Sequence, residues 1–136
     1  YESLYPFVRK LLNSPHVFVM GVCLGHQIIC ASLGFDVEHS LSPVHGHTET
    51  LDLSQWKSSP VFLDEVIHTQ RYNSLSVKED STIVDSLASL GFSCFVLEGE
   101  LVILSSLTCA SYQFHPESVG TSCPQKFFSC LNEFLL

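Results

Sequence analysis

The sequence predicts an α/β fold with antiparallel additions, and three observations support this class. A run of β-branched and apolar residues at 16–22 has the length of a buried parallel strand. It leads directly into a helical pattern at 24–33, which is the strand–helix alternation of α/β proteins. The later apolar runs 92–97 and 101–104 flank a Glu-Gly-Glu turn and indicate an antiparallel hairpin. Because 46% of the 136 residues are hydrophobic, we expect one packed domain over residues 1–136.

The other elements follow from local patterns. Residues 2–12 carry apolar side chains at helical spacing, with Pro6 in the first turn. Gly34 is suited to end the helix that begins at residue 24. We also expect a short strand at 35–38, a turn-rich segment at 41–50, a short helix or strand at 61–67, a polar loop with strand edges at 70–75, a strand at 110–114 and an amphipathic helix at 124–136.

Charge and cysteine content limit the classes of partner. The formal net charge is −8, from six Lys and Arg against fourteen Asp and Glu. No basic cluster could neutralise phosphates, which argues against binding nucleic acid or an anionic membrane surface. No apolar run reaches the roughly 18 residues of a membrane-spanning helix. The six cysteines allow disulfides, but most of them lie in apolar or Ser-rich surroundings that suit small hydrophobic thiols, so we expect a reduced, cytoplasmic protein. These are Cys30, Cys94, Cys109 and Cys130.

A cysteine motif lies at the junction of the first predicted strand and helix. Gly21-Val22-Cys23-Leu24-Gly25 has the pattern G-x-C-x-G. A sharp turn there would project the Cys23 thiol above the sheet, as in nucleophile elbows. We expect the glycines at 21 and 25 to prevent clashes within so tight a turn. The helix N-terminus would favour a Cys23 thiolate, and the N–H of Leu24 would form half of an oxyanion hole.

Other interpretations of these residues stay open. A buried structural cysteine in a glycine-flanked turn is the alternative to a nucleophile, because the pattern is short. His26 and Gln27 favour the nucleophile, since polar residues just inside such a turn can face a substrate. His45 and His47 resemble metal ligands, but no third ligand is nearby, so we expect neither a metal nor a cofactor.

Residues 112–118, YQFHPES, supply the groups that a thiolate nucleophile needs. Because His115 precedes Pro116, its backbone is extended. Residues i and i+2 of an extended chain share a face, so Glu117 is placed to orient the His115 ring while that ring faces Cys23. These three residues form a candidate catalytic triad. The alternatives are a surface histidine at 115 and a helix N-terminal acid at 117.

Four motifs together resemble the class I, triad-type glutamine amidotransferases. GVCLGHQ at 21–27 is similar to the nucleophile motif of this family, and YQFHPES at 112–118 is similar to its His-x-Glu motif. VHGHT at 44–48 and RYNSL at 71–75 resemble segments of the chorismate-using subgroup. Within the family, the chain therefore looks most like the glutaminase subunits of anthranilate and aminodeoxychorismate synthases. From the residues alone, RYNSL is equally compatible with a surface turn.

The resemblance implies a flavodoxin-like α/β fold and a glutaminase activity. Cys23 would attack the side-chain amide of L-glutamine to form a thioester. His115, oriented by Glu117, would protonate the departing ammonia and then activate water. A chorismate-binding synthase subunit would receive the ammonia through a channel. By the same resemblance, the groups that hold the glutamine and its oxyanion would be Gln27, Ser74, the backbone of Leu75 and the N–H of Leu24.

The sequence also departs from the family pattern. The family begins with a strand–helix–strand unit and a Gly-Pro-Gly turn that supplies a second oxyanion donor, whereas Tyr1 aligns just after that turn. We therefore expect an N-terminally truncated, partial domain: a fragment, a degraded copy or a separately encoded half. Loss of one oxyanion donor costs about 10²–10³ in rate. In addition, His47 and Asn73 replace a usual Lys and His, and residues 92–108 show little of the usual pattern.

Three functions fit these observations. The first is an active glutaminase, which intact Cys23, His115 and Glu117 favour. The second is a truncated, catalytically weak or inactive remnant that only binds the chorismate-using subunit, which the lack of the oxyanion turn favours. The third is a thiol hydrolase that acts on esters or peptides without a partner, and the subgroup motifs argue against it.

Overall fold

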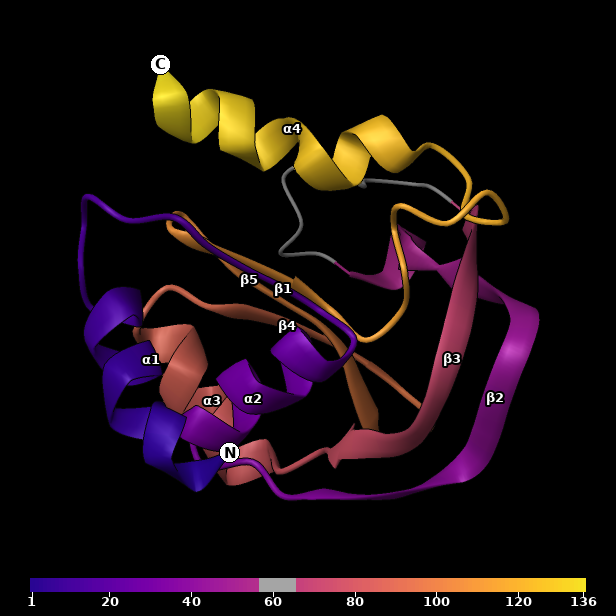
Figure 1. The fold of residues 1–136 in the computed structure, drawn as a ribbon, viewed down its shortest axis with the longest axis horizontal. Coiled ribbons are helices and arrows are strands. Elements are labelled where there is room, and N and C mark those ends of the chain that lie inside the picture. The colour runs from indigo at the N-terminus through magenta and orange to yellow at the C-terminus, as the bar shows by residue number, and fades with distance from the viewer. Residues whose placement is uncertain (57–65) are drawn as a thin grey trace.

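A mixed sheet forms the centre of the computed structural model, which describes residues 1–56 and 66–136 (Figure 1). Within these residues, strands pair in the order β1-β6-β5-β3-β2, and β4 pairs with β5 off this path. The strands are β1 Val19–Val22, β2 Val37–Asp52, β3 Val66–Lys78, β4 Ser93–Leu97, β5 Glu100–Ser106 and β6 Cys109–Tyr112. The pair β1–β6 is parallel, and the other described pairs are antiparallel. The α/β class predicted from the sequence is confirmed.

Helices cover both faces of this sheet. Figure 1 shows α1, α2 and α3 together on one side and α4 on the other. The predicted helices near 2–12, 24–33 and 124–136 are confirmed, and Pro6 lies in the first turn of α1. No helix in the described part of the chain is long and apolar enough to cross a membrane. The helices are α1 Tyr5–Leu12, α2 Leu24–Ser32, α3 Ser81–Ser89 and α4 Pro124–Leu135, with short 3-10 turns at Glu2–Leu4 and Leu53–Gln55.

Helix α3 is not among the elements predicted from the sequence. Its N-cap is Asp80, whose carboxylate accepts a hydrogen bond from the backbone N–H of Ile83 at 3.1 Å. Ile83 and Leu87 then pack at helical spacing against the core on that face of the sheet. An aspartate before apolar residues spaced three and four apart is the sequence signal that identifies this helix.

The β2–β3 ribbon corrects two predictions. Residues 41–50, expected to be turn-rich, and residues 70–75, expected to be a polar loop, both lie in these long antiparallel strands. Their pairing runs from Val37 opposite Val77 to Asp52 opposite Val66. Register shifts on either side of residues 44–45 absorb the proline and glycine that suggested turns.

Three strand predictions are adjusted at their boundaries. The strand expected at 16–22 is limited to β1, and the strand expected at 110–114 is β6, which ends two residues earlier. Residues 35–36 precede β2 rather than forming a strand of their own. Of the segment 61–67, expected to be a short helix or strand, residues 61–65 lie outside the described residues and 66–67 begin β3.

The predicted hairpin is confirmed as β4 and β5, which pair antiparallel across a tight turn. Glu98 and Gly99 have φ values of 51° and 78°, and two successive positive φ angles are what a type I′ turn, which matches strand twist, requires.

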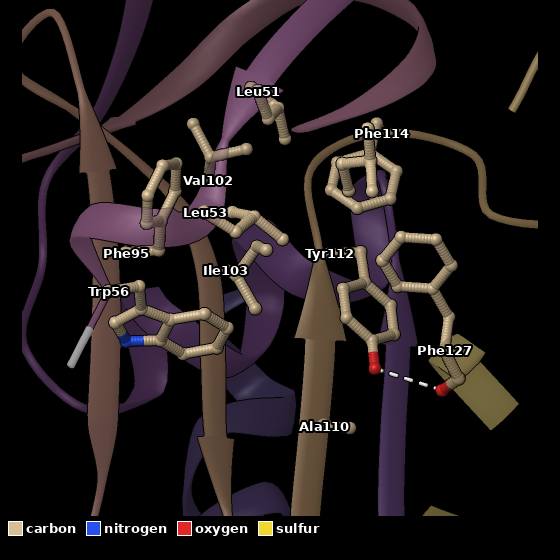
Figure 2. Packing of buried hydrophobic residues seen from close by; sticks show 11 residues of the cluster. Leu51, Leu53, Trp56, Phe95, Val102, Ile103, Ala110, Tyr112, Phe114 and Phe127 are labelled. Carbon is tan, nitrogen blue, oxygen red and sulfur yellow. Dashed lines mark hydrogen bonds between the residues drawn. The ribbon is translucent and has the colours of Figure 1, made fainter. Parts of the chain in front are cut away.

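Two hydrophobic clusters pack on the two faces of the sheet. One contains side chains of α2 and α3, with partly buried residues of α1 against it. The other contains aromatic residues of β6 and α4 (Figure 2). There the Tyr112 hydroxyl donates to the Phe127 carbonyl at 2.9 Å, and the Phe114 and Phe127 rings meet edge to face at 5.2 Å. This packing fixes the end of β6, from which the chain continues to His115.

Candidate active site

The parallel pair β1–β6 brings two predicted motifs to one edge of the sheet. Val22 lies opposite Tyr112 at the carboxyl ends of the two strands. The backbone N–H of Cys23 donates to the Tyr112 carbonyl at 2.8 Å. Cys23 and the segment that leads to His115 therefore leave the sheet side by side, which is where ligands bind in open α/β sheets.

Cys23 occupies a strained elbow between β1 and α2. Its φ and ψ angles are 50° and −102°, outside the regions that residues with a Cβ usually adopt. A Cβ at Gly21 would lie 2.6 Å from Cδ1 of Ile29 and 2.8 Å from the carbonyl carbon of Gly25. Glycine at 21 is therefore required for the turn, as predicted. At Gly25 the expected clash is wrong, because a Cβ there would meet no atom within 4 Å.

The groups around the Cys23 thiol have opposing effects on its pKa. Burial is the largest effect and raises the pKa of the thiol, whereas a hydrogen bond from the N–H of Leu24 lowers it. The carboxylate of Glu117 also raises this pKa, and the guanidinium of Arg71 lowers it. The expected contribution of the helix N-terminus is present through Leu24, but burial outweighs it.

The His115 ring is held on several sides. Its Nδ1 lies 2.6 Å from Oε1 of Glu117, and its ring meets the Tyr72 ring edge to face at 5.4 Å. The backbone N–H of His115 donates to the Gln70 carbonyl at 2.8 Å, which ties this segment to β3. Because a carboxylate only accepts, Nδ1 carries the proton in this pair and Nε2 is left with its lone pair.

Among the described residues, no hydrogen bond joins Sγ of Cys23 to the His115 ring. Sγ instead receives a long hydrogen bond from Nε2 of Gln113 at 3.9 Å. The structure thus pairs His115 with Glu117 and places Glu117 within electrostatic range of Cys23. The catalytic roles of the three residues stay a prediction.

The residues expected to hold glutamine lie on α2 and β3. Nε2 of Gln27 donates to the backbone carbonyl of Leu75 at 2.8 Å, which links the two elements. The side chains of Ser74 and Leu75 are exposed, and so is that of Leu24 at the start of α2. Oγ of Ser74 lies 3.5 Å from Nε2 of His45 on β2. Their roles in binding likewise stay a prediction.

His26 does not face a substrate, which corrects the expectation for this residue. Its ring is fully buried against the sheet: Nε2 lies 2.9 Å from the Leu101 carbonyl and Nδ1 lies 2.9 Å from Oγ of Ser111. The carbonyl can only accept, so Nε2 carries the proton and Nδ1 accepts from the Ser111 hydroxyl. Burial lowers the pKa of His26 to about 4.

A buried ion cluster under the β2–β3 ribbon was missed by sequence reasoning. Arg71 is 3% exposed, so the interpretation of RYNSL as a surface turn is wrong. Its guanidinium contacts Glu49 at 3.0 Å, Glu100 at 2.9 Å and, through Nε, Oδ1 of Asn73 at 3.0 Å. Strand alternation gives the one available signal, because Arg71, Asn73 and the buried Ile67 share a face at even spacing.

Glu100 completes this cluster. Burial raises the pKa of its carboxyl, but four hydrogen bonds outweigh burial and lower the pKa to about 2. The donors are the hydroxyls of Ser76 and Ser40, the guanidinium of Arg71 and the backbone N–H of Leu41. In residues 1–56 and 66–136, no group of three or more His, Cys, Asp or Glu side chains could hold a metal ion, and His45 and His47 are exposed.

These features define an α/β protein with a cysteine elbow and a His–Glu pair at the carboxyl edge of its sheet. Comparison with known proteins gives its family. A family model described as "Glutamine amidotransferase class-I" matches residues 2–133, and the chain belongs to this family. The resemblance seen in the four motifs is confirmed.

Curated relatives are similar over most of the chain. It is 33% identical over 111 residues to "Aminodeoxychorismate/anthranilate synthase component 2" of Bacillus subtilis (strain 168), covering 76% of the chain and 52% of that protein. It is 30% identical over 135 residues to "Anthranilate synthase component 2" of Pseudomonas putida, covering 94% of the chain and 63% of that protein. The chain thus spans about half to two thirds of the length of these two relatives.

Solved structures share the fold. A putative GMP synthase protein from Thermoplasma acidophilum superposes with a TM-score of 0.69 at 17% sequence identity, covering 98% of this chain and 64% of that one. A glutamine amidotransferase from Thermotoga maritima superposes with a TM-score of 0.60 at 15% identity, covering 98% and 54%. The flavodoxin-like α/β fold implied by the resemblance is confirmed.

Proposed function

We propose that the chain is the glutaminase component of an anthranilate or aminodeoxychorismate synthase. His115 takes the proton of the Cys23 thiol, and the thiolate attacks the side-chain carbonyl carbon of L-glutamine. The C–N bond breaks as His115 returns that proton to the departing ammonia. His115 then takes a proton from water, the hydroxide attacks the thioester, and glutamate leaves as Cys23 recovers the proton.

One observation carries the proposal: a strained cysteine at the N-terminus of α2 shares an edge of the sheet with a hydrogen-bonded His–Glu pair. Strain at a non-glycine residue persists only where the surrounding structure enforces it, and such residues cluster at active sites. The lone pair on Nε2 of His115 is the base that this arrangement leaves available. The N–H of Leu24, at the first turn of α2, is the proposed oxyanion donor.

The glutamine substrate would lie between α2 and β3. Gln27 uses its NH₂ group on Leu75, and in the described part of the chain its Oε1 accepts no hydrogen bond. This oxygen is suited to accept from the ammonium group of glutamine. The exposed Ser74 and the backbone of Leu75 would form the opposite side of the site.

We propose that the ammonia is received by a chorismate-binding synthase subunit. The names of the relatives, components of anthranilate and aminodeoxychorismate synthases, support this partner. We further propose a single glutamine amidotransferase domain over residues 1–136, which the family match supports, and a cytoplasmic location, which six free thiols support.

A second candidate is a catalytically weak or inactive member of the family that only binds the synthase subunit. Two observations favour it: burial raises the pKa of the Cys23 thiol, and Sγ is hydrogen-bonded to Gln113 rather than to His115. Burial reduces the fraction of thiolate, and among the described residues no base is hydrogen-bonded to the thiol to take its proton.

Labelling with a glutamine-analogue electrophile separates the two candidates. The purified chain is incubated with the reagent, with and without the synthase subunit, and modified peptides are identified by mass spectrometry. The glutaminase predicts labelling at Cys23 that excess L-glutamine prevents and that Cys23→Ser abolishes. Cys123→Ser is the matched control, because this thiol is exposed and far along the chain in the segment before α4. Absence of Cys23 labelling with the partner present would falsify the glutaminase.

A further inference from the structure

The hydrogen bond to Sγ of Cys23 comes from a residue to which neither the motifs nor the family comparison assigns a role. Gln113 follows β6 directly, is 1% exposed, and its backbone N–H donates to the Val102 carbonyl at 2.9 Å. Its Nε2 lies 3.9 Å from Sγ. The orientation of the buried Gln113 amide decides whether its NH₂ group or its oxygen faces Sγ of Cys23.

Hydrogen-bond chemistry determines that direction. The Leu75 carbonyl can only accept, so the NH₂ group of Gln27, at 2.8 Å, must point to it. The same NH₂ group donates to Oε1 of Gln113 at 3.1 Å. The Gln113 oxygen therefore faces Gln27, and its NH₂ group faces Sγ of Cys23. We call this chain, from the Leu75 carbonyl through Gln27 and Gln113, the amide relay.

Both amides of the relay are shielded from solvent, which makes its polarity hard to reverse. Gln27 is 7% exposed and Gln113 is 1% exposed. A flipped Gln113 amide would place its oxygen against Sγ and its NH₂ against the NH₂ of Gln27, leaving buried donors without acceptors. Nδ2 of Asn73 also donates to the Leu75 carbonyl at 2.9 Å, and Arg71 fixes the Asn73 amide from the other side.

We propose that Gln113 is a positioning residue for the nucleophile, which holds Sγ of Cys23 in place and donates a hydrogen bond to its thiolate. The proposal rests on the proposed function, since it takes Cys23 as the nucleophile. The Gln113 donor acts together with the N–H of Leu24 and against the carboxylate of Glu117. A hydrogen bond to the charged form favours that form, so Gln113 offsets part of the effect of burial.

The test is the pH dependence of Cys23 alkylation by iodoacetamide, followed by peptide-resolved mass spectrometry so that the other thiols do not interfere. Gln113→Met keeps the length of the side chain and removes the donor. We expect the midpoint of the alkylation profile to rise by about one pH unit, which makes the reaction at pH 8 about tenfold slower. Gln125→Met, on the exposed face of α4, is the matched control and should leave the midpoint unchanged.

Two further variants keep the test decisive if Gln113→Met does not fold. Gln113→Glu retains an acceptor for Gln27 but presents a carboxylate to Sγ, so its midpoint should rise further. Gln27→Met frees the Gln113 amide to rotate and should give a smaller rise. A midpoint in the folded Gln113 variants equal to that of the unmodified chain overturns the positioning role.

Iodoacetamide reports on the thiol alone, so the two proposals can fail separately. Normal labelling by the glutamine analogue with an unchanged alkylation midpoint in Gln113→Met contradicts only the positioning role. A raised midpoint in a chain that the glutamine analogue never labels supports the contact between Gln113 and Cys23 and contradicts the glutaminase.

Discussion

The buried His26 should make the stability of the fold depend on pH between neutrality and pH 4. Its pKa falls from 6.5 to about 4 on folding because burial opposes the charged ring. Between these values the unfolded chain binds a proton at His26 and the folded chain does not. Acid therefore stabilises the unfolded state, and the stability that is fully present above pH 6.5 is lost as the pH falls towards 4.

The two pKa values give the size of the effect. Linkage predicts a loss of about 2 kcal/mol between pH 7 and pH 5, and about 3 kcal/mol once the folded ring is protonated too. Urea unfolding at pH 7, 6 and 5, followed by the fluorescence of Trp56, measures this loss. Trp56 is the single tryptophan and is buried in the core, so its emission reports on the packed state.

The His26→Gln variant isolates the contribution of His26. Its amide NH₂ can still donate to the Leu101 carbonyl, so the fold is kept while the titrating group is removed. Between pH 7 and pH 5, the free energy of unfolding of His26→Gln should fall by about 2 kcal/mol less than that of the unmodified chain. His16→Gln, at an exposed position before β1, is the control and should keep the full pH dependence. Equal pH dependence in the unmodified chain and His26→Gln would refute the reasoning.

Three further predictions concern the elbow and the ion cluster. Gly21→Ala should lower the free energy of unfolding by about 2 kcal/mol and slow alkylation of the Cys23 thiol, because the added Cβ would clash with Ile29 and the backbone of Gly25. Urea unfolding measures the first effect, and iodoacetamide kinetics measure the second. Gly25→Ala should instead stabilise the fold by about 0.5–1 kcal/mol, since the position is helical and open, and a loss like that of Gly21→Ala would contradict the described turn. Arg71→Met should cost about 3 kcal/mol in urea unfolding because it removes the nearer cation of the buried Glu100 and leaves Lys78, at 3.5 Å, and a cost under about 1 kcal/mol would contradict the described ion cluster.

The parts of the fold that the sequence predicts are those with local signals. The strand before Cys23, helix α2 and the β4–β5 hairpin each follow from a run of residues and a glycine turn next to it. The pairing of His115 with Glu117 at 2.6 Å also follows from local geometry, because an extended chain puts residues two apart on one face.

The parts that sequence patterns miss depend on partners that are distant in the chain. Arg71 looks like a surface residue until Glu100, on β5, is placed beside it. His26 looks like a substrate-facing residue until the Leu101 carbonyl and Ser111 approach it from the sheet. In both cases a polar side chain is buried because its acceptors come from other strands, and no local pattern contains that information.

The buried charges under the ribbon contribute to the site through a backbone group. Replacing a buried ion cluster by apolar residues often leaves stability unchanged or improves it, so stability alone is a weak reason for Arg71 and Glu100. Arg71 fixes the Asn73 amide, and Asn73 in turn fixes the Leu75 carbonyl, the acceptor from which the amide relay takes its direction. The strained elbow and the ion cluster therefore support the same contact: the elbow projects Sγ of Cys23 over the edge of the sheet, and the cluster helps to hold in place the carbonyl at which the amide relay starts.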